Sequence, residues 1–424
     1  METMKILYLT SSFQHPSLRG HTRCYYFIKE LSRRHEITLL SATLFPVPHD
    51  ARQDMAAYTK QILVFDGSGR ARDLLGCLPR IGARLQREWE YNLAGRKMKA
   101  ALKQLVRQGS YDVLLLHGKV LFPVIRDFDD LPIVIDMCDA TSLRLGRQMA
   151  YSRWFKRAWL GLQYLRAHRL EKEMVARSRN LAFISCRDRD AVLGPGRTAE
   201  VAPIGVDCEL WTRQTGQPSS HTLIFTGVMS YGPNVDAAAY LIDHIVPRVR
   251  KEIPDLEVYI VGRDPLPVLR EKASRQVGVH VTGFVHDVKP YLERSAVAVA
   301  PIRYGAGIQN KLLEAMAMEV PVVTTALAAE GLRMQGGLNP PLYVASDAEE
   351  FAQRVVTLLR DPVERARLAR QGRQFVRRNY VWSHGAETLE RMCFQAVAQA
   401  HSREHLAAEF SGSMRQGKHA EETQ

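Results

Sequence analysis

The residues from Ala300 to Thr325 have the types and spacing of a site that binds an anion. Gly305 and Gly307 flank a single residue, and glycines so placed allow positive φ angles and a close approach of a ligand to the backbone. Asn310 can cap the following helix, which would direct free N–H groups and the positive end of the helix dipole toward the loop. Lys311 adds a formal charge in the first turn. The segment therefore predicts a phosphate-binding loop between a strand and a helix.

Glu314 extends this site toward a nucleotide. It follows Lys311 by three residues, so both side chains lie on nearly the same helix face. A carboxylate there could accept hydrogen bonds from a diol such as a ribose. The alternative is an ordinary connection with two turn glycines, because a GxG pattern alone is weak evidence of binding.

The run KLLEAMAMEVPVV, from Lys311 to Val323, resembles the nucleotide-binding signature of the retaining glycosyltransferases of family four. In that family a Glu is followed after seven residues by a second Glu, and then by AMA, Gly and PVV. Glu314 matches the second Glu, whereas Ala306 stands at the first position and Glu319 replaces the Gly that ends the helix. A left-handed backbone at Glu319 would cost about 1 kcal/mol. The glycine-rich loop with its lysine indicates a sub-branch of the family.

The resemblance implies an α/β fold of the GT-B type, in which two doubly wound Rossmann-like domains face a cleft. The length of 424 residues also favours two domains of about 200 residues each. We expect residues 1–205 to form the first domain and 206–380 the second. A helix over 381–400, with Trp382 and Leu389 on its apolar face, should return to the first domain, and 401–424 should be a disordered tail.

The six cysteines are scattered without a CxxC pair, which argues against a disulfide framework and a zinc site and fits a reducing compartment. The first 13 residues lack the features of a signal peptide, and no apolar run approaches the roughly 18 residues of a membrane span. We therefore expect a cytoplasmic protein, and the family resemblance implies that it needs no metal or other cofactor.

Basic residues are concentrated in two blocks, within a net charge of +13 that calls for an anionic partner. The blocks span 70–107 and 144–179, and both interleave cations with aromatic and aliphatic residues. Each block could lie on the anionic inner surface of the cytoplasmic membrane. The alternative is a pair of solvated helix faces over a core.

The first domain opens with a βαβ pattern, which we assign to a strand at Lys5–Thr10, a helix at 22–33 and a strand at 36–41. A later strand, 111–116, ends at His117, and a histidine at the carboxyl end of a parallel strand faces the ligand crevice. The resemblance implies that His117 contacts the donor sugar near the reaction centre. A purely structural histidine is the alternative.

Two further features of the first domain could take part in binding. Gly20 matches the first loop of the family, which contacts phosphate or acceptor, although a turn glycine is equally consistent. Asp136 and Asp139, in DMCDATS, could be acid–base groups or metal ligands. We favour a role for Asp139 or Thr141 as the cap of the next helix, because no third metal ligand stands nearby in the sequence.

The second domain follows a polar linker at 212–221 and begins with a strand at 222–226. Its first loop, from Gly227, lacks the Arg and Lys with which many relatives of the family neutralise the diphosphate. Lys311, Arg303 and helix N-termini are therefore expected to neutralise it. By resemblance, the backbone at Gly283 and Phe284 would pair with the edge of the base.

The hypothesis that these patterns favour is a glycosyltransferase that moves a sugar from a nucleoside diphosphate sugar to a hydroxyl of a glycan or lipid-linked acceptor. The resemblance implies that the transfer retains the anomeric configuration. Its setting would be glycan or exopolysaccharide assembly at the membrane surface. A nucleotide-sugar epimerase or hydrolase on the same fold, and a non-catalytic nucleotide-sugar-binding subunit, remain alternatives. Charge alone would also fit a nucleic-acid binder, which we do not expect.

Overall fold

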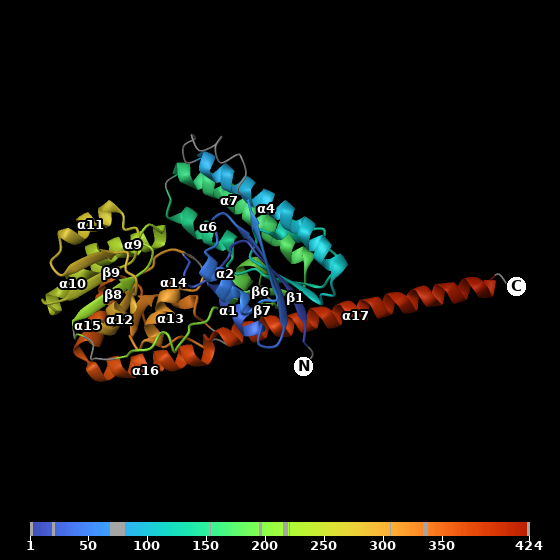
Figure 1. Cartoon of the computed structure of the whole chain (residues 1–424). Helices are drawn as coiled ribbons and strands as arrows, with labels where there is room; N and C mark the ends of the chain where they lie inside the picture. Colours follow the sequence, from blue (N-terminus) through green and yellow to red (C-terminus); the bar gives the residue numbers. More distant parts are fainter. Residues whose placement is uncertain are drawn as a thin grey trace.

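The computed structural model describes most of the chain, namely residues 3–18, 22–67, 81–152, 154–194, 197–214, 219, 221–305, 307–333 and 338–421. For residues 81–90, 155 and 403–421 only the backbone is described. Two lobes lie side by side in Figure 1, the first to the right and the second to the left.

The first lobe is built on a seven-stranded parallel sheet in the order β3-β2-β1-β4-β5-β6-β7. Its strands are β1 (Lys5–Thr10), β2 (Glu36–Thr43), β3 (Gln61–Asp66), β4 (Val113–His117), β5 (Ile133–Asp136), β6 (Leu181–Phe183) and β7 (Glu200–Val201). The helices between them are α1 (Arg23–Leu31), α2 (His49–Ala56), α4 (Ile81–Gln108), α5 (Phe122–Ile125), α6 (Thr141–Ala150), α7 (Trp154–Arg177) and α8 (Cys186–Leu193). The strand order reverses between β1 and β4, which makes that edge the topological switch point.

The second lobe repeats the plan with a six-stranded parallel sheet in the order β10-β9-β8-β11-β12-β13. Its strands are β8 (Thr222–Thr226), β9 (Glu257–Val261), β10 (Val279–Gly283), β11 (Val297–Ala300), β12 (Val322–Thr325) and β13 (Tyr343–Ala345). The other elements are α9 (Gly232–Tyr240), the π-helical turn η1 (Leu241–Ile245), α10 (Val246–Glu252), α11 (Pro267–Ser274), α12 (Lys289–Arg294), α13 (Asn310–Ala317), α14 (Ala326–Glu330), α15 (Ala348–Arg360) and α16 (Pro362–Asn379). Here the switch point lies between β8 and β11.

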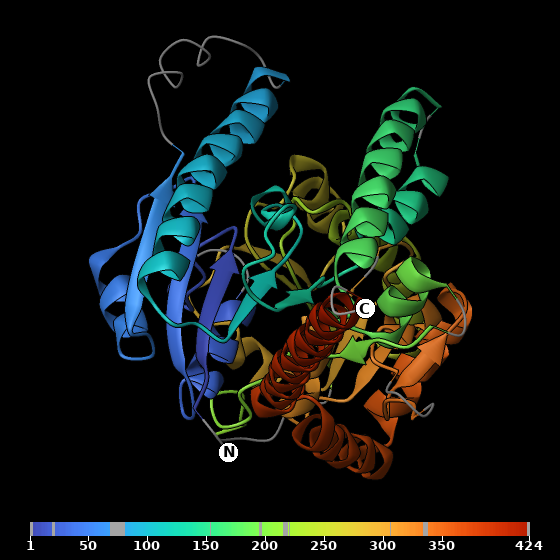
Figure 2. The same ribbon diagram turned by 90° about the vertical axis from the view of Figure 1, so that its right-hand side faces the viewer.

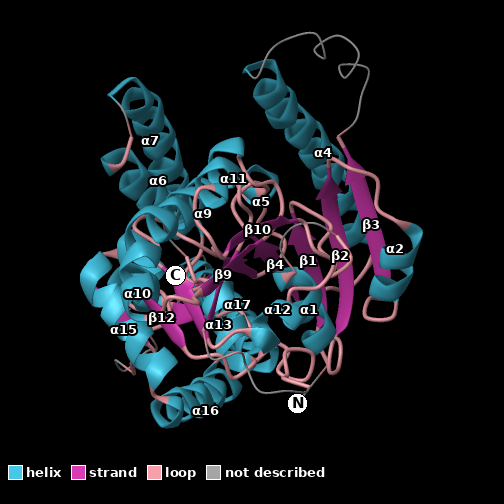
Figure 3. Cartoon of the chain, turned by 90° about the vertical axis from the view of Figure 1, so that its left-hand side faces the viewer, coloured by secondary structure: helices cyan, strands magenta, loops and turns pink. Residues whose placement is uncertain are grey.

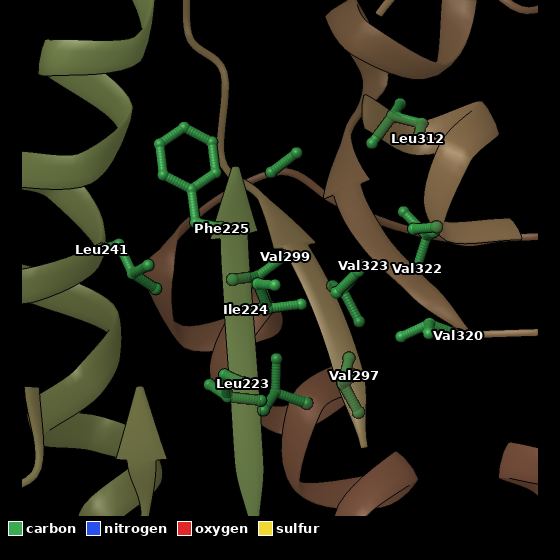
Figure 4. Packing of buried hydrophobic residues seen from close by; sticks show 14 of the residues in the cluster. Leu223, Ile224, Phe225, Leu241, Val297, Val299, Leu312, Val320, Val322 and Val323 are labelled. Carbon is green, nitrogen blue, oxygen red and sulfur yellow. The ribbon is translucent and has the colours of Figure 1, made fainter. Parts of the chain in front are cut away.

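The strands of both sheets are nearly continuous apolar runs because helices cover both of their faces. In the second lobe, Phe225 on β8 and Val299 on β11 pack within the layer that Leu312 of α13 closes (Figure 4). All three side chains are at most 2% exposed. This packing fixes α13 against the sheet and thereby places the loop before it.

The chain returns to the first lobe at Trp382, where α17 (Trp382–Glu421) begins. The indole stacks on Tyr26 with ring centroids 4.5 Å apart, and Leu389 and Met392 enter the core of the first lobe. The boundary expected at 205–206 lies between β7 and β8. The expected disordered tail from His401 is wrong, since α17 continues as a helix to Glu421 and extends beyond the body (Figure 1). The segment contains no proline that would end the helix.

Two long helices rise from one side of the first lobe. Figures 2 and 3 show α4 on one flank and α6 with α7 on the other, with their ends directed away from the sheet. These helices contain most of the two basic blocks. Among the described residues, no helix is both long and apolar enough to cross a membrane.

Candidate functional site at the interlobe switch points

The predicted phosphate loop leaves the carboxyl end of β11, next to the loop that leaves β8. Parallel sheets bind ligands at this position, in the crevice where the strand order reverses. The two loops are joined by Lys311 on α13, whose Nζ donates a 2.6 Å hydrogen bond to Asn234 Oδ1 on α9. The same ammonium lies 4.5 Å from the ring centre of Phe225. The structure thus brings the residues after both strands into one site.

Lys311 and Glu314 are partly buried at this site, and burial shifts both pKa values toward neutrality. Burial lowers the pKa of Lys311 to about 7, although the nearby carboxylate of Glu314 opposes the change. Burial also raises the pKa of Glu314 to about 7, and Lys311 opposes that shift. Both groups can therefore change protonation near neutral pH when a charged ligand arrives.

The glycines of the site are required by its geometry. A Cβ on Gly227 would lie 2.6 Å from Asn234 Nδ2 and 3.1 Å from Lys311 Nζ, so a side chain would break their contact. Gly305 and Gly307 have φ angles of 142° and 78°, which other residues rarely adopt. The positive φ angles expected at Gly305 and Gly307 are therefore present.

The helix behind the loop begins one residue earlier than the capping prediction required. Asn310 is the first helical residue, Gln309 is the N-cap, and no side chain caps this end. The prediction that Asn310 caps α13 is therefore wrong, because its backbone already has helical geometry. The first-turn N–H groups of an α-helix have no intrahelical partner, so the tip can still bind an anion.

The other end of α13 carries the predicted left-handed residue. Glu319 has a φ of 54°. The N–H groups of Glu319 and Val320 bond to the carbonyl oxygens of Met316 and Ala315, at 3.1 and 2.9 Å, the pattern of a Schellman motif.

Arg303 is engaged elsewhere in the second lobe. Its guanidinium binds both oxygens of Asp236, at 2.9 and 2.5 Å, and lies 4.6 Å from the ring centre of Tyr240. The expectation that Arg303 neutralises a diphosphate would require it to leave this bidentate pair. Lys311, in the first turn of α13, is therefore the second-lobe cation that directly follows the loop.

Gly283 and Phe284, the residues expected near the base, follow the end of β10. Gly283 has a φ of 77°, and the Phe284 ring is 59% exposed and meets His286 edge-on. The carbonyl oxygen of Gly283 accepts a hydrogen bond from Thr282 Oγ1 at 3.0 Å, and contact with a base stays a prediction.

In the first lobe, the switch point holds His117 and Asp136. The strand register pairs Thr10 with His117, and His117 with Asp136. His117 and Asp136 therefore lie side by side at the carboxyl ends of β4 and β5. His117 Nδ1 lies 2.9 Å from Asp136 Oδ2, and Arg23 binds both oxygens of Asp136 at 2.9 and 3.1 Å. His117 is only 6% exposed, and Asp136 is fully buried.

Burial and charge act in opposite directions on this cluster. Burial alone would raise the pKa of Asp136, but Arg23 and the hydrogen bond with His117 hold it well below its usual range. Burial also disfavours the charged form of His117, yet Cys138, Cys24 and the hydrogen bond to Asp136 raise the pKa of His117 well above its ordinary value. The cluster is therefore an ion-paired network of Arg23, Asp136 and His117.

Cys138 lies beside His117 and Asp136 and could be a third metal ligand, which the sequence analysis did not identify near Asp136 and Asp139. Its Sγ lies 3.6 Å from His117 Nε2, and ligand atoms of His117, Asp136 and Cys138 all lie within 4.8 Å of one another. The donor set does not fit a cation, because the guanidinium of Arg23 already binds both carboxylate oxygens and would repel a metal ion.

The capping role expected for Asp139 or Thr141 is wrong. The N-cap residue of α6 is Ala140, and no side chain caps the helix. Asp188 instead accepts a hydrogen bond from the backbone of Ala140 at 2.9 Å, while Lys119 donates to Thr141 Oγ1. Gly20, the predicted acceptor or phosphate contact, lies outside the described residues, as does Ala306.

Two first-lobe residues that sequence reasoning missed reach the phosphate loop. Arg147 on α6 lies 3.4 Å from the carbonyl oxygen of Gly305, and Arg187 on α8 lies 2.8 Å from that of Gly307. Tyr151 stacks on Tyr304 beside them, with ring centroids 5.1 Å apart. The loop therefore lies between the lobes and not on an outer surface.

Comparison with known proteins agrees with this geometry. Residues 220–361 match the family described as "Glycosyl transferases group 1". A "Phosphatidyl-myo-inositol mannosyltransferase" from Mycobacterium leprae is 33% identical over 190 residues, which cover 44% of this chain and 50% of that protein. The match thus spans about half the length of this curated relative.

Solved structures with little sequence identity share the whole architecture. HepE of Anabaena, crystallised with UDP and glucose, aligns with a TM-score of 0.61 at 15% identity, over 92% of this chain and 98% of that one. Sucrose-phosphate synthase of Thermosynechococcus elongatus aligns with a TM-score of 0.64 at 15% identity, over 93% and 100% of the two chains. The chain therefore has the GT-B fold, and its second lobe carries a domain of the group 1 glycosyltransferase family.

Proposed function

We propose that this protein is a glycosyltransferase that transfers a sugar from a nucleoside diphosphate sugar to an acceptor hydroxyl, with retention of configuration. The observation that carries the proposal is the placement of Lys311, the glycines at 305 and 307, and the tip of α13 at the interlobe switch point. The match of this lobe to group 1 glycosyltransferases supports the same reaction class.

In this proposal the chain's own groups stabilise the leaving diphosphate. The ammonium of Lys311 and the N–H groups at the tip of α13 lie where negative charge develops as the bond between sugar and phosphate breaks. Glu314 binds the ribose hydroxyls, and the backbone at Gly283 and Phe284 contacts the base. The ribose assignment places a carboxylate on the same helix face as the lysine, one turn away.

The first lobe would hold the sugar and the acceptor. His117, oriented by its bond to Asp136, contacts the sugar near the reaction centre. The acceptor hydroxyl attacks the anomeric carbon, the bond to the diphosphate breaks, and a phosphate oxygen of the leaving group takes the hydroxyl proton. Exclusion of water from the site prevents water from reacting with the oxocarbenium-like sugar in place of the acceptor.

The acceptor in this proposal is a glycan or a lipid-linked glycan at the cytoplasmic face of a membrane. Helix α7 supports this location because it has large apolar side chains with high exposed fractions: Trp154 is 82% exposed, Leu165 64% and Trp159 51%. Exposed cations accompany them on the same helix: Lys156, Arg157, Arg166 and Arg169. Basic residues with interfacial tryptophans favour binding to anionic lipid.

Vesicle binding tests the membrane part of the proposal. Trp154→Glu with Trp159→Glu should abolish co-sedimentation with vesicles of phosphatidylcholine and phosphatidylglycerol. Val363→Glu, at a 76% exposed position on α16 of the second lobe, is the matched control and should bind like the unmodified protein. Equal loss in both variants, or no binding to anionic vesicles at all, would exclude α7 as a membrane surface.

Product analysis tests the reaction. Thermal shift with UDP, GDP, ADP and dTDP should identify one stabilising nucleotide, and the corresponding nucleotide sugars with membrane extracts should give an acceptor heavier by one sugar residue. Glu314→Ala should weaken nucleotide binding by about 1–3 kcal/mol. Binding without transfer to any acceptor would instead favour a non-catalytic nucleotide-sugar-binding subunit.

A further inference from the structure

The charges around the phosphate loop come largely from the lobe opposite to it. Arg187 Nη2 donates to the carbonyl oxygen of Gly307 at 2.8 Å, and Arg187 Nη1 donates to that of Leu327 at 3.1 Å. Arg147 Nη1 approaches the carbonyl oxygen of Gly305 at 3.4 Å. Both arginines belong to first-lobe helices, α6 and α8, whereas their acceptors belong to the second lobe.

The two guanidinium groups share a single carboxylate. Glu330 Oε2 lies 3.3 Å from Arg147 Nη2 and 3.5 Å from Arg187 Nη1. Ion pairs to guanidinium are usually shorter, at about 2.7–2.9 Å, so both contacts are loose. Glu330 is also 44% exposed at its side chain. Two cations therefore share one loosely held, solvated carboxylate beside the loop.

The guanidinium of Arg187 is unusually well buried for a charged group. Its side chain is only 8% exposed, and its Nε is buried with no hydrogen-bond partner among the described residues. Burial lowers the pKa of Arg187, and the charge of Arg147 adds to that effect while Asp188 and Glu330 oppose it. A buried guanidinium with an unsatisfied donor is costly unless an anion completes its shell.

The two second-lobe cations expected at the diphosphate both have partners within the lobe. Arg303 is bound at both ends of its fork by Asp236, and Lys311 is bonded to Asn234. The loop from Gly227 to Asp236 contains neither Arg nor Lys. A diphosphate in this loop would carry more negative charge than Lys311 alone can balance.

We propose that Arg147 and Arg187 of the first lobe bind the diphosphate of the donor across the cleft, and that Glu330 takes the place of the diphosphate between them when no donor is bound. Guanidinium groups match phosphate oxygens in a bidentate geometry, so exchange from Glu330 and the loop carbonyls to a diphosphate conserves their hydrogen bonds. This inference rests on the proposed donor site and assigns the residues that complete it.

The exchange also explains why the donor site spans both lobes. Because the two arginines are on α6 and α8 and the loop is in the second lobe, donor binding would hold the lobes together in the arrangement seen here. Glu330 would compete with the diphosphate for the same guanidinium groups. Removal of this competitor should therefore strengthen donor binding, which a merely structural ion pair would not do.

Three variants test the proposal by isothermal titration with the nucleoside diphosphate that stabilises the unmodified protein, among UDP, GDP, ADP and dTDP. Arg147→Gln and Arg187→Gln should each weaken its binding about 10- to 100-fold, the effect of losing a charged hydrogen bond. Glu330→Gln should tighten it about 2- to 5-fold. Binding of the parent nucleoside, which lacks phosphate, should stay unchanged in all three.

Arg126→Gln is the matched control, because Arg126 also forms a first-lobe ion pair, with Glu173 at 2.9 Å, far along the sequence from the loop. It should leave diphosphate binding unchanged. Unchanged diphosphate affinity in Arg147→Gln, or weaker binding in Glu330→Gln, overturns the inference while the proposed function stands. If Arg187→Gln does not fold, the other two variants decide. Absence of nucleoside diphosphate binding by the unmodified protein overturns the proposed function and this inference together.

Discussion

Lys311 and Asn234 join the two loops of the donor site through a 2.6 Å hydrogen bond, although 76 residues separate them in the chain. Asn234 Nδ2 in turn donates to the carbonyl oxygen of Val228, at 3.1 Å, so the side chain also ties the first loop of the second lobe to α9. The bond therefore sets where the ammonium stands relative to the glycine loop. Gly227 makes the contact possible because it has no side chain.

Substitution of Gly227 by alanine should break this arrangement. Its Cβ would stand 2.6 Å from Asn234 Nδ2 and 3.1 Å from Lys311 Nζ. We expect Gly227→Ala to cost about 1–3 kcal/mol in the free energy of unfolding and to weaken nucleoside diphosphate binding at least about tenfold.

Gly95→Ala on α4 is the matched control for this variant, because its Cβ would meet nothing closer than Val124 Cγ2 at 3.4 Å. It should leave nucleotide affinity unchanged in calorimetric titration. Equal affinity in Gly227→Ala and the unmodified protein would mean that Lys311 does not need its bond to Asn234.

Much of the fold could be predicted because four strands of the second lobe, β8 to β11, are short apolar runs that end at, or just before, a glycine or proline. The strands at Lys5–Thr10 and 222–226 were predicted to the residue. The helix that starts at Asn310 was placed correctly, but its cap was not, since a side chain one residue inside a helix and one at its cap give the same sequence pattern.

The pH dependence of stability should reflect the shifted pKa values of the partly buried pair Lys311 and Glu314. Glu314 has a pKa of about 7, above its unfolded value of about 4.3, so its stabilising contribution is lost as the pH rises from about 4.5 to about 7. Lys311 has a pKa of about 7, below its unfolded value of about 10.4, so its contribution returns as the pH rises from about 7 to about 10.

Together, the two pKa shifts place the minimum of the free energy of unfolding near pH 7. Compared with a Lys311→Met and Glu314→Gln double variant, the unmodified protein should be least stable near pH 7, by about 1–3 kcal/mol relative to pH 5 and pH 9. Urea unfolding at the three pH values measures the difference. A pH-independent difference between the two proteins would show that neither pKa is shifted.

Removal of the Asp136 carboxylate should destabilise the first lobe. Asp136→Asn leaves the guanidinium of Arg23 buried without its counter-charge, which should cost about 3–5 kcal/mol. Because the pKa of Asp136 is lowered, its contribution is present above the unfolded value of about 3.9 and lost as the pH falls below it. The variant should therefore lose less stability than the unmodified protein on acidification.

Asp129→Asn serves for comparison, since Asp129 pairs with Arg177 at 2.8 Å but is 86% exposed at its side chain. It should change the urea midpoint by less than the equivalent of about 1 kcal/mol. A similar small change in Asp136→Asn would show that the buried cluster adds nothing to stability.

Glu319→Gly should stabilise the second lobe by about 1 kcal/mol, because glycine adopts the φ of 54° without the Cβ clash of a left-handed residue. Glu319→Gln keeps that strain and removes only the 3.7 Å ion pair with Arg373, so it should be nearly neutral. Thermal unfolding of both variants measures the effect. A loss of stability in Glu319→Gly would mean that the contacts of the Glu319 side chain stabilise the fold by more than its left-handed backbone destabilises it.

The parts of the site that the sequence did not reveal depend on contacts between lobes. Arg147 lies within the basic block at 144–179 and Arg187 lies just beyond it, so neither stands out in the sequence from the arginines around it. Their approach to Gly305 and Gly307 depends on how the two sheets face each other, which no local pattern encodes. Asp236, which binds Arg303 within the second lobe, could not be identified from the chain alone, because the two residues are 67 positions apart and meet only when α9 packs beside the loop after β11.

The central claim is that the ammonium of Lys311, with the backbone at the tip of α13, binds a diphosphate. Calorimetric titration of Lys311→Met with the stabilising nucleoside diphosphate and with its parent nucleoside tests this claim most directly. The account predicts a loss of at least about tenfold in affinity for the diphosphate and no change for the nucleoside. Equal affinity of Lys311→Met and the unmodified protein for the diphosphate would contradict it.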